Sequence, residues 1–213
     1  MMQIKRFVCN PLQENTYVVF DETRECAIID CGCYTDGEKE TLSQFVSEQG
    51  LKVKHLLCTH LHFDHIFGNK FIFDTYGISP EASAKDADWL EDMCRRAQIL
   101  GIDCEEGIVP LGKDLKEGDE INVGAILLKV LAVPGHSAGG LVFYDPKEKV
   151  AFVGDSIFCG SVGRTDLPGG NQQQLVDSLT QKVLALPAET MLLPGHGEVT
   201  NVAFEREHNP YLF

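Results

Sequence analysis

CTHLHFDHIFGN, residues 58–69, places three histidines and one aspartate within six positions, in a chain of 213 residues that has only seven histidines. It follows an apolar run that predicts a buried strand. His60 and His62 would share one face of such a strand, but His65 breaks the alternation, so the chain must turn into a helix near this residue. At that turn His60 and His62 can point one way while Asp64 and His65 point another. The stretch therefore predicts two neighbouring sites rather than one.

Three further polar residues follow predicted buried strands in the same way. LAVPGH ends in His136, AFVGD ends in Asp155 and MLLPGH ends in His196. A lone histidine after a strand is more often a structural residue, and we expect this of His55 and His208. Gathering so many polar side chains at buried strand ends is costly unless they are paired or bound to metal. The whole set therefore predicts a metal site at one edge of the sheets.

The remaining pattern predicts two β-sheets covered by helices. Short β-rich runs separated by turn residues fill the first thirty residues, and residues 121–133 and 141–155 each predict a pair of strands. Hairpins mixed with strand–helix steps favour two sheets over one parallel sheet. Periodicity, together with a capping pair at Asn171 and Gln174, predicts helices over five ranges: 35–50, 66–77, 86–101, 172–186 and 201–208.

Charge and composition exclude several classes of partner. The net charge of −14 argues against nucleic acid or an anionic membrane surface, because binding to either needs clustered positive charge. No apolar run approaches the ~20 residues of a membrane helix, and the start lacks the order of a secretory signal. We therefore expect a cytoplasmic protein whose eight cysteines are reduced thiols, without the C-x₂-C pairs of structural zinc sites. Its oligomeric state cannot be predicted from these features.

The histidine and aspartate constellation resembles the metallo-β-lactamase superfamily in THLHFDH (59–65), GH (135–136), GD (154–155) and GH (195–196). The resemblance implies an α+β fold, an αββα sandwich of two mixed sheets with a metal site at one edge. Imidazoles and carboxylates suit zinc, with iron and manganese as alternatives, so we expect two divalent ions. The resemblance assigns three ligands to the first ion, three to the second and one bridge: His60, His62 and His136; Asp64, His65 and His196; and Asp155.

Within the superfamily, residues 153–171 look like the glyoxalase II-like (hydroxyacylglutathione hydrolase-like) hydrolases. A basic residue at the position of Arg164 contacts the substrate in that group, so Arg164 is a candidate substrate-binding residue. The alternative is an ion pair with Asp166 that braces the loop, and Asp166 also replaces a tyrosine of the group. We expect a single metallo-β-lactamase-type domain over residues 1–213, without the C-terminal helical glutathione-binding segment of full glyoxalase II.

The resemblance predicts an enzyme that hydrolyses a small-molecule thioester by means of a hydroxide bridging the two metals, with Asp64 as ligand or as acceptor for that hydroxide. Three alternatives remain open. Sulfur dioxygenases share the motif but would bind one iron through His60, His136 and Asp155, and would oxidise a persulfide. A lactone or phosphodiester hydrolase of the same fold is the second alternative. A non-catalytic metal-binding module with a closed coordination shell is the third.

Overall fold

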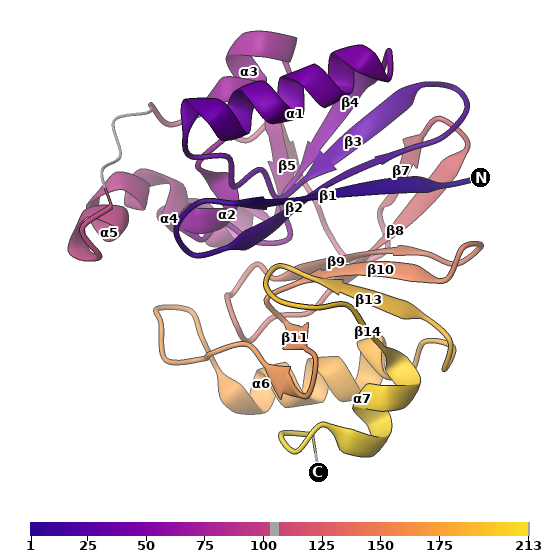
Figure 1. The fold of residues 1–213 in the computed structure, drawn as a ribbon. Coiled ribbons are helices and arrows are strands. Elements are labelled where there is room, and N and C mark those ends of the chain that lie inside the picture. The colour runs from indigo at the N-terminus through magenta and orange to yellow at the C-terminus, as the bar shows by residue number, and fades with distance from the viewer. Residues whose placement is uncertain (103–106, 213) are drawn as a thin grey trace.

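Two six-stranded β-sheets form the centre of the structure, and helices cover their outer faces (Figure 1). The computed structural model describes residues 1–102 and 107–212. The strand order is β1-β2-β3-β4-β5-β6 in the first sheet and β14-β13-β10-β9-β8-β7 in the second. A two-stranded hairpin, β11 and β12, lies outside both sheets. The predicted α+β sandwich of two sheets flanked by helices is therefore confirmed.

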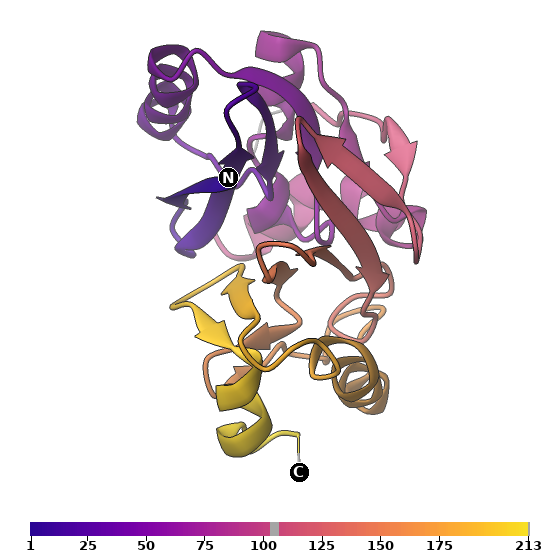
Figure 2. The same ribbon diagram turned by 90° about the vertical axis from the view of Figure 1, so that its right-hand side faces the viewer.

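The first sheet is built from the first half of the chain and the second sheet from the second half. Figure 2 shows the indigo-to-magenta half above the orange-to-yellow half. The first sheet comprises β1 (Gln3–Cys9), β2 (Glu14–Phe20), β3 (Glu25–Ile29), β4 (Lys52–Leu57), β5 (Pro80–Ala82) and β6 (Lys113–Asp114). The second comprises β7 (Glu120–Val123), β8 (Ile126–Ala132), β9 (Leu141–Asp145), β10 (Val150–Gly154), β13 (Met191–Pro194) and β14 (Thr200–Asn201). The hairpin strands are β11 (Ile157–Phe158) and β12 (Ser161–Val162).

Short helices connect and cover these strands. The helices are α1 (Asp36–Glu48), α2 (Phe63–Ile66), α3 (Asn69–Tyr76), α4 (Ala87–Glu91), α5 (Met93–Ile99), α6 (Gln172–Ser178) and α7 (Val202–His208). A 3₁₀ turn, η1 (Ala84–Asp86), precedes α4, and a π-helical turn, η2 (Leu179–Val183), extends α6. The predicted cap of α6 is confirmed, because the Asn171 side chain accepts the N–H of Gln174 at 2.9 Å.

Both sheets are mixed, and their parallel pairs determine where the strands end. β3 runs parallel to β4, and β10 runs parallel to β13. The carboxyl ends within each pair therefore lie at one edge of a sheet. Two backbone hydrogen bonds join the sheets at this edge, from the N–H of Asn15 to the carbonyl of Gly195 at 2.7 Å and from the N–H of Leu141 to the carbonyl of Thr59 at 2.7 Å.

The main core lies between the sheets, and β2 shows how one strand serves two layers. All seven residues of β2 are buried. Since successive side chains point to opposite faces of a strand, Tyr17 and Val19 face the second sheet while Val18 and Phe20 face α1. The Tyr17 ring meets Phe152 of β10 edge to face, with 5.4 Å between the ring centroids. This two-sided burial explains the run YVVF, in which large apolar residues do not alternate with polar ones.

Two of the predicted helices are interrupted, each for a local reason. The helix predicted over 66–77 is divided between α2 and α3, because Gly68 docks against Cys31. The Gly68 N–H donates to the Cys31 carbonyl at 2.8 Å, and a Cβ at Gly68 would lie 2.4 Å from the Cys31 sulfur. The helix predicted over 86–101 breaks at Asp92, whose backbone (φ −98°, ψ 2°) leaves the α region.

Most cysteines of the described residues are free thiols. Cys94 is disulfide-bonded, so the expectation that all eight are reduced is wrong at this position. A disulfide depends on two side chains meeting in the fold, which sequence spacing does not reveal. Cys104 lies outside the described residues. The free cysteines are Cys9, Cys26, Cys31, Cys33, Cys58 and Cys159. None of the described helices is both long and apolar enough to cross a membrane.

Candidate metal centre

The predicted ligands follow strand ends at the shared edge of the two sheets. His60 and His62 lie in the turn between β4 and α2, where His62 precedes the first residue of the helix. His136 lies in the loop between β8 and β9, Asp155 directly follows β10, and His196 lies two residues after the end of β13. The turn at α2 separates His62 from Asp64 as predicted, because Asp64 already belongs to the helix. The structure therefore brings all the predicted ligands to one place.

Three histidines form the first cluster. The Nε2 atom of His136 lies 3.3 Å from Nε2 of His60 and 2.9 Å from Nδ1 of His62, and all three side chains are buried. Two of the rings also have a nitrogen that points away from the cluster, called here the outer nitrogen. The hydrogen bonds of these outer nitrogens fix the tautomers of the two rings. His136 donates Nδ1–H to the carbonyl of Arg164 at 2.8 Å. His60 donates Nδ1–H to the Thr59 hydroxyl at 3.0 Å, because that hydroxyl already donates to a carboxylate.

The Nδ1–H bonds therefore turn Nε2 of His60 and Nε2 of His136 toward one another, with Nδ1 of His62 beside them. Burial, reinforced by the neighbouring histidines, lowers the pKa of His60 well below its usual range. Burial and His136 lower the pKa of His62 to about 3. Unprotonated imidazole nitrogens that converge in a buried place repel one another, so a cation placed among them would relieve this arrangement. The first cluster thus has the chemistry of a metal site.

The second cluster consists of Asp64, His65 and His196. The Nε2 atoms of His196 and His65 lie 3.2 and 3.8 Å from Oδ2 of Asp64. The His196 ring donates Nδ1–H to the carbonyl of Leu12 at 3.1 Å. The Nε2 atom of His65 is buried and lies 3.3 Å from Oδ1 of Asp155, but among the described residues it has no partner with hydrogen-bond geometry. A buried nitrogen left in this state is one a metal ion would satisfy.

Asp155 stands between the two clusters. Its Oδ1 lies 3.3 Å from Nε2 of His65, and its Oδ2 lies 3.8 Å from Nε2 of His136 and 3.7 Å from Nε2 of His196. Burial alone would raise the pKa of Asp155, but the charge on His65 outweighs it and the pKa falls below its usual range. One carboxylate thus offers an oxygen toward each cluster, the arrangement expected of a bridging ligand.

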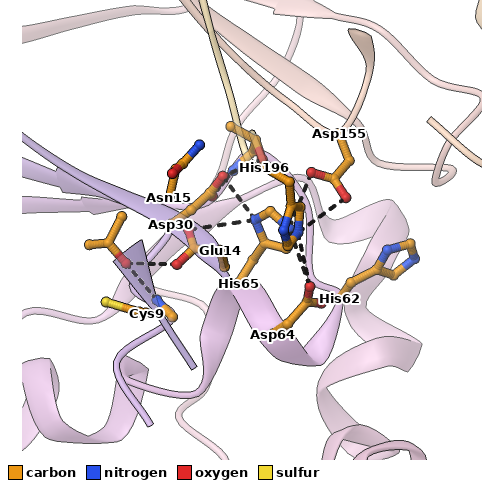
Figure 3. Close-up of polar contacts among 12 residues, drawn as sticks. Cys9, Glu14, Asn15, Asp30, His62, Asp64, His65, Asp155 and His196 are labelled. Carbon is orange, nitrogen blue, oxygen red and sulfur yellow. Dashed lines mark hydrogen bonds and ion pairs between the residues drawn. The ribbon is translucent and has the colours of Figure 1, made fainter. Parts of the chain in front are cut away.

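His65 lies among three carboxylates, those of Asp30, Asp64 and Asp155 (Figure 3). Burial lowers its pKa, but the carboxylates of Asp155 and Asp64 outweigh burial, and the pKa of His65 lies well above its usual range. Conversely, burial would raise the pKa of Asp64, yet His65 and the His196 bond hold it below its usual range. A proton on His65 occupies the place that a dication would take among the same carboxylates.

Two buried acids behind His65 belong to the centre and were missed in the sequence. Asp30 accepts hydrogen bonds from the Thr59 N–H at 2.7 Å, from the Thr59 hydroxyl at 2.6 Å and from Nδ1–H of His65 at 3.2 Å. Glu14 is fully buried, and its Oε1 lies 3.9 Å from the same His65 nitrogen. Burial raises the pKa of Glu14 well above its usual range. The signal for Asp30 was present, since it ends the apolar run ECAIID as Asp155 ends AFVGD.

The structure places Arg164 in an exposed ion pair. Its guanidinium binds the carboxylate of Asp166 at 2.7 and 2.8 Å, and this pairing lowers the pKa of Asp166 to about 2. The ion pair with Asp166, which was the alternative role for Arg164, is therefore present. Substrate contact by Arg164 stays a prediction. His55 and His208 lie outside the clusters as predicted: His55 pairs with Glu81 at 2.6 Å and His208 bonds the carbonyl of Phe204.

This chain combines two mixed sheets flanked by helices with histidine and aspartate clusters that could hold metal ions. Its class is therefore that of the metallohydrolases. A family model described as "Metallo-beta-lactamase superfamily" matches residues 9–196, and the chain belongs to that superfamily.

Two named relatives are similar to this chain over almost its full length. "Probable metallo-hydrolase YqgX" of Bacillus subtilis (strain 168) is 36% identical, covering 99% of this chain and 98% of the relative. "Hydroxyacylglutathione hydrolase GloC" of Haemophilus influenzae (strain ATCC 51907 / DSM 11121 / KW20 / Rd) is 32% identical with the same coverage.

Two solved structures share the fold, each at 34% identity. The BLEG-1 B3 metallo-beta-lactamase superposes with a TM-score of 0.88 over 99% of each chain. TTHA1623 in a di-iron-bound form superposes with a TM-score of 0.87 over 98% of this chain and all of the other.

Proposed function

We propose that this chain binds two divalent metal ions and hydrolyses thioesters of small molecules. The observation that carries the proposal is the convergence of two clusters of histidine and aspartate side chains on either side of Asp155. We assign the first ion to His60, His62 and His136. We assign the second ion to Asp64, His65 and His196, with Asp155 as the bridge. Zinc suits this mixture of imidazole and carboxylate donors, and the di-iron form of TTHA1623 supports iron as the alternative.

Bound metal ions would supply hydroxide at neutral pH and an electrophile for the substrate carbonyl. The residues of the chain prepare the site for this chemistry. The Arg164 carbonyl holds His136, the Leu12 carbonyl holds His196 and Asp30 holds His65, each through Nδ1–H. These bonds place Nδ1–H of each ring away from the centre and turn Nε2 of each ring toward it.

Asp64 is the residue to which we assign a part in the reaction itself. Its Oδ2 faces Nε2 of His196 at 3.2 Å, so its second oxygen is available to accept a hydrogen bond from the attacking water. Asp64 keeps 8% of its surface exposed, whereas Glu14 is fully buried. Asp64 would then serve as ligand through one oxygen and would orient the nucleophile through the other.

The thioester is favoured over other substrates by a relative and by the chemistry of the leaving group. GloC, named for hydroxyacylglutathione hydrolysis, aligns over 99% of this chain. A thiol has a pKa near 8.5, so a thiolate leaves with little help from a general acid. Arg164 lies in the loop after β12 with its side chain exposed, and we propose that its guanidinium exchanges Asp166 for a substrate carboxylate.

The test is to measure metal content and hydrolysis together on the purified chain. We expect two equivalents of metal, and turnover of an S-acyl glutathione in a panel that also contains a lactone, a phosphodiester and a persulfide. His62→Ala should lose metal and turnover together, whereas His208→Ala, outside both clusters, should keep them. Full turnover by metal-free protein would contradict the proposal. Oxygen consumption with the persulfide alone would replace it with the dioxygenase alternative.

A further inference from the structure

Asp86 is a buried carboxylate outside the two ligand clusters, and it bonds both loops that carry the first cluster. It ends the turn η1 just before α4, and its side chain is 1% exposed. Its Oδ2 accepts the N–H of Leu61 at 3.4 Å, and its Oδ1 accepts the N–H of Gly139 at 2.6 Å. Leu61 lies between His60 and His62 in sequence, and Gly139 lies three residues after His136.

The two loops come from different sheets, so Asp86 joins the two halves of the molecule at the site. Leu61 follows β4 of the first sheet and Gly139 precedes β9 of the second. Only glycine permits the short contact, because a Cβ at position 139 would lie 2.6 Å from Cγ of Asp86. An asparagine could not make both bonds, since its amide nitrogen would face a second N–H donor.

The same segment reaches the cluster a second time through Trp89. The Trp89 indole packs against the His62 ring with 4.2 Å between centroids and 64° between planes. The outer nitrogen of His62, Nε2, is buried without a hydrogen-bond partner among the described residues. The rings of His60 and His136 are each held by an oxygen at the outer nitrogen. The His62 ring is instead held in place by packing on Trp89.

We propose that segment 86–89 is the positioning element of the first metal site. Asp86 fixes the spacing between the loops of His60 and His136, and Trp89 fixes the orientation of His62. The proposal rests on the metal binding assigned above and concerns only the first ion. Among the described residues, no hydrogen bond, ion pair or ring contact joins Asp86 or Trp89 to the second cluster, whose outer bonds run to Asp30 and Leu12.

The test measures Zn²⁺ affinity by competition with a chromophoric chelator in two backgrounds. His196→Ala disables the second site and His136→Ala disables the first. Replacing a group that orients a metal ligand typically weakens binding about 10–100-fold. We expect Asp86→Asn to show a loss of this size in the His196→Ala background and no measurable loss in the His136→Ala background. Equal losses in both backgrounds, or none in the first, would overturn the proposal.

Asp21 provides a matched control. It is buried like Asp86, and it also joins turns of the two sheets by accepting the N–H groups of Thr23 at 2.9 Å and Ala125 at 2.7 Å. It follows the end of β2 remote from the metal centre, so Asp21→Asn should leave zinc affinity unchanged in both backgrounds. If Asp86→Asn does not fold, Trp89→Leu in the same two backgrounds decides the question, with the same expected selectivity.

The outcomes separate this inference from the proposed reaction. If the wild-type chain binds zinc and Asp86→Asn acts selectively, but no thioester is turned over, the proposed reaction fails while the positioning role stands. If the wild-type chain turns over thioesters and Asp86→Asn and Trp89→Leu both leave first-site affinity unchanged, the positioning role alone fails. A wild-type chain that binds no zinc would overturn both.

Discussion

Replacing Asp30 with alanine should both destabilise the fold and loosen the metal centre. The carboxylate is 2% exposed and accepts three hydrogen bonds, two from Thr59 at the end of β4 and one from His65. The change leaves three donors buried without an acceptor. It also removes the group that keeps His65 turned toward the site.

The magnitude follows from those three bonds. A hydrogen bond to a charged group contributes about 1.5–3 kcal/mol, so three would give about 5–9 kcal/mol if they were additive. The sum is an upper limit, because removing Asp30 also removes the cost of burying its charge. Breaking a buried charged pair by removing one partner costs about 3–5 kcal/mol, and we expect this loss for Asp30→Ala. A domain with about 5–15 kcal/mol of stability can remain folded after such a loss.

The assay is urea unfolding of metal-free protein, followed by chelator competition with zinc on the folded variants. Asp145 provides the control, because it is equally buried and accepts the N–H groups of Lys147 and Glu148 in the β9–β10 turn, away from the ligands. Asp145→Ala should lose stability and keep its zinc affinity, whereas Asp30→Ala should lose both. An unfolding free energy for Asp30→Ala within about 1 kcal/mol of wild type would refute the reasoning.

Three further predictions follow from other contacts. Since the pKa of His65 in the metal-free fold lies above the ordinary ~6.5, the stability contributed by its proton is present below that value and is lost as pH rises through the raised pKa. Metal must displace this proton, so the gain in melting temperature on adding zinc should be larger at about pH 8 than at about pH 6; a smaller gain would contradict the assignment. Arg164→Ala should raise KM for an acidic thioester more than it lowers kcat. An unchanged KM would contradict substrate binding by Arg164 and would leave it only the ion pair with Asp166. Gly68→Ala should destabilise the chain by about 1–3 kcal/mol in urea unfolding, because the new Cβ would clash with Cys31. An unchanged free energy of unfolding would show that the structure accommodates the methyl group without cost.

Much of the site could be predicted because its residues share one local pattern. Each predicted ligand follows an apolar strand or the turn after it, and strands that run parallel in a sheet end at a common edge. The break in alternation at His65 was enough to separate the two clusters. The cap of α6 could also be predicted, since the Asn171 bond to Gln174 is local.

The remaining features depend on partners that are distant in sequence. Asp30 meets His65 only because β3 pairs with β4 in parallel, and Asp86 meets Gly139 only across the two sheets. The residues next to Asp30 and Asp86 in the sequence do not indicate which distant residue each of them will contact. The division between α2 and α3 likewise depends on Gly68 docking against Cys31. The short strands β5, β6, β11 and β12 are too brief for periodicity to reveal. The extent of the predicted single domain stays a prediction.

The most direct measurement is anomalous diffraction at the zinc edge from crystals of this chain grown with zinc. Two peaks should appear about 3.5–4 Å apart. One peak should lie among His60, His62 and His136, the other among Asp64, His65 and His196, with Asp155 between them. No peak at these residues, or zinc bound only elsewhere on the surface, would contradict the account.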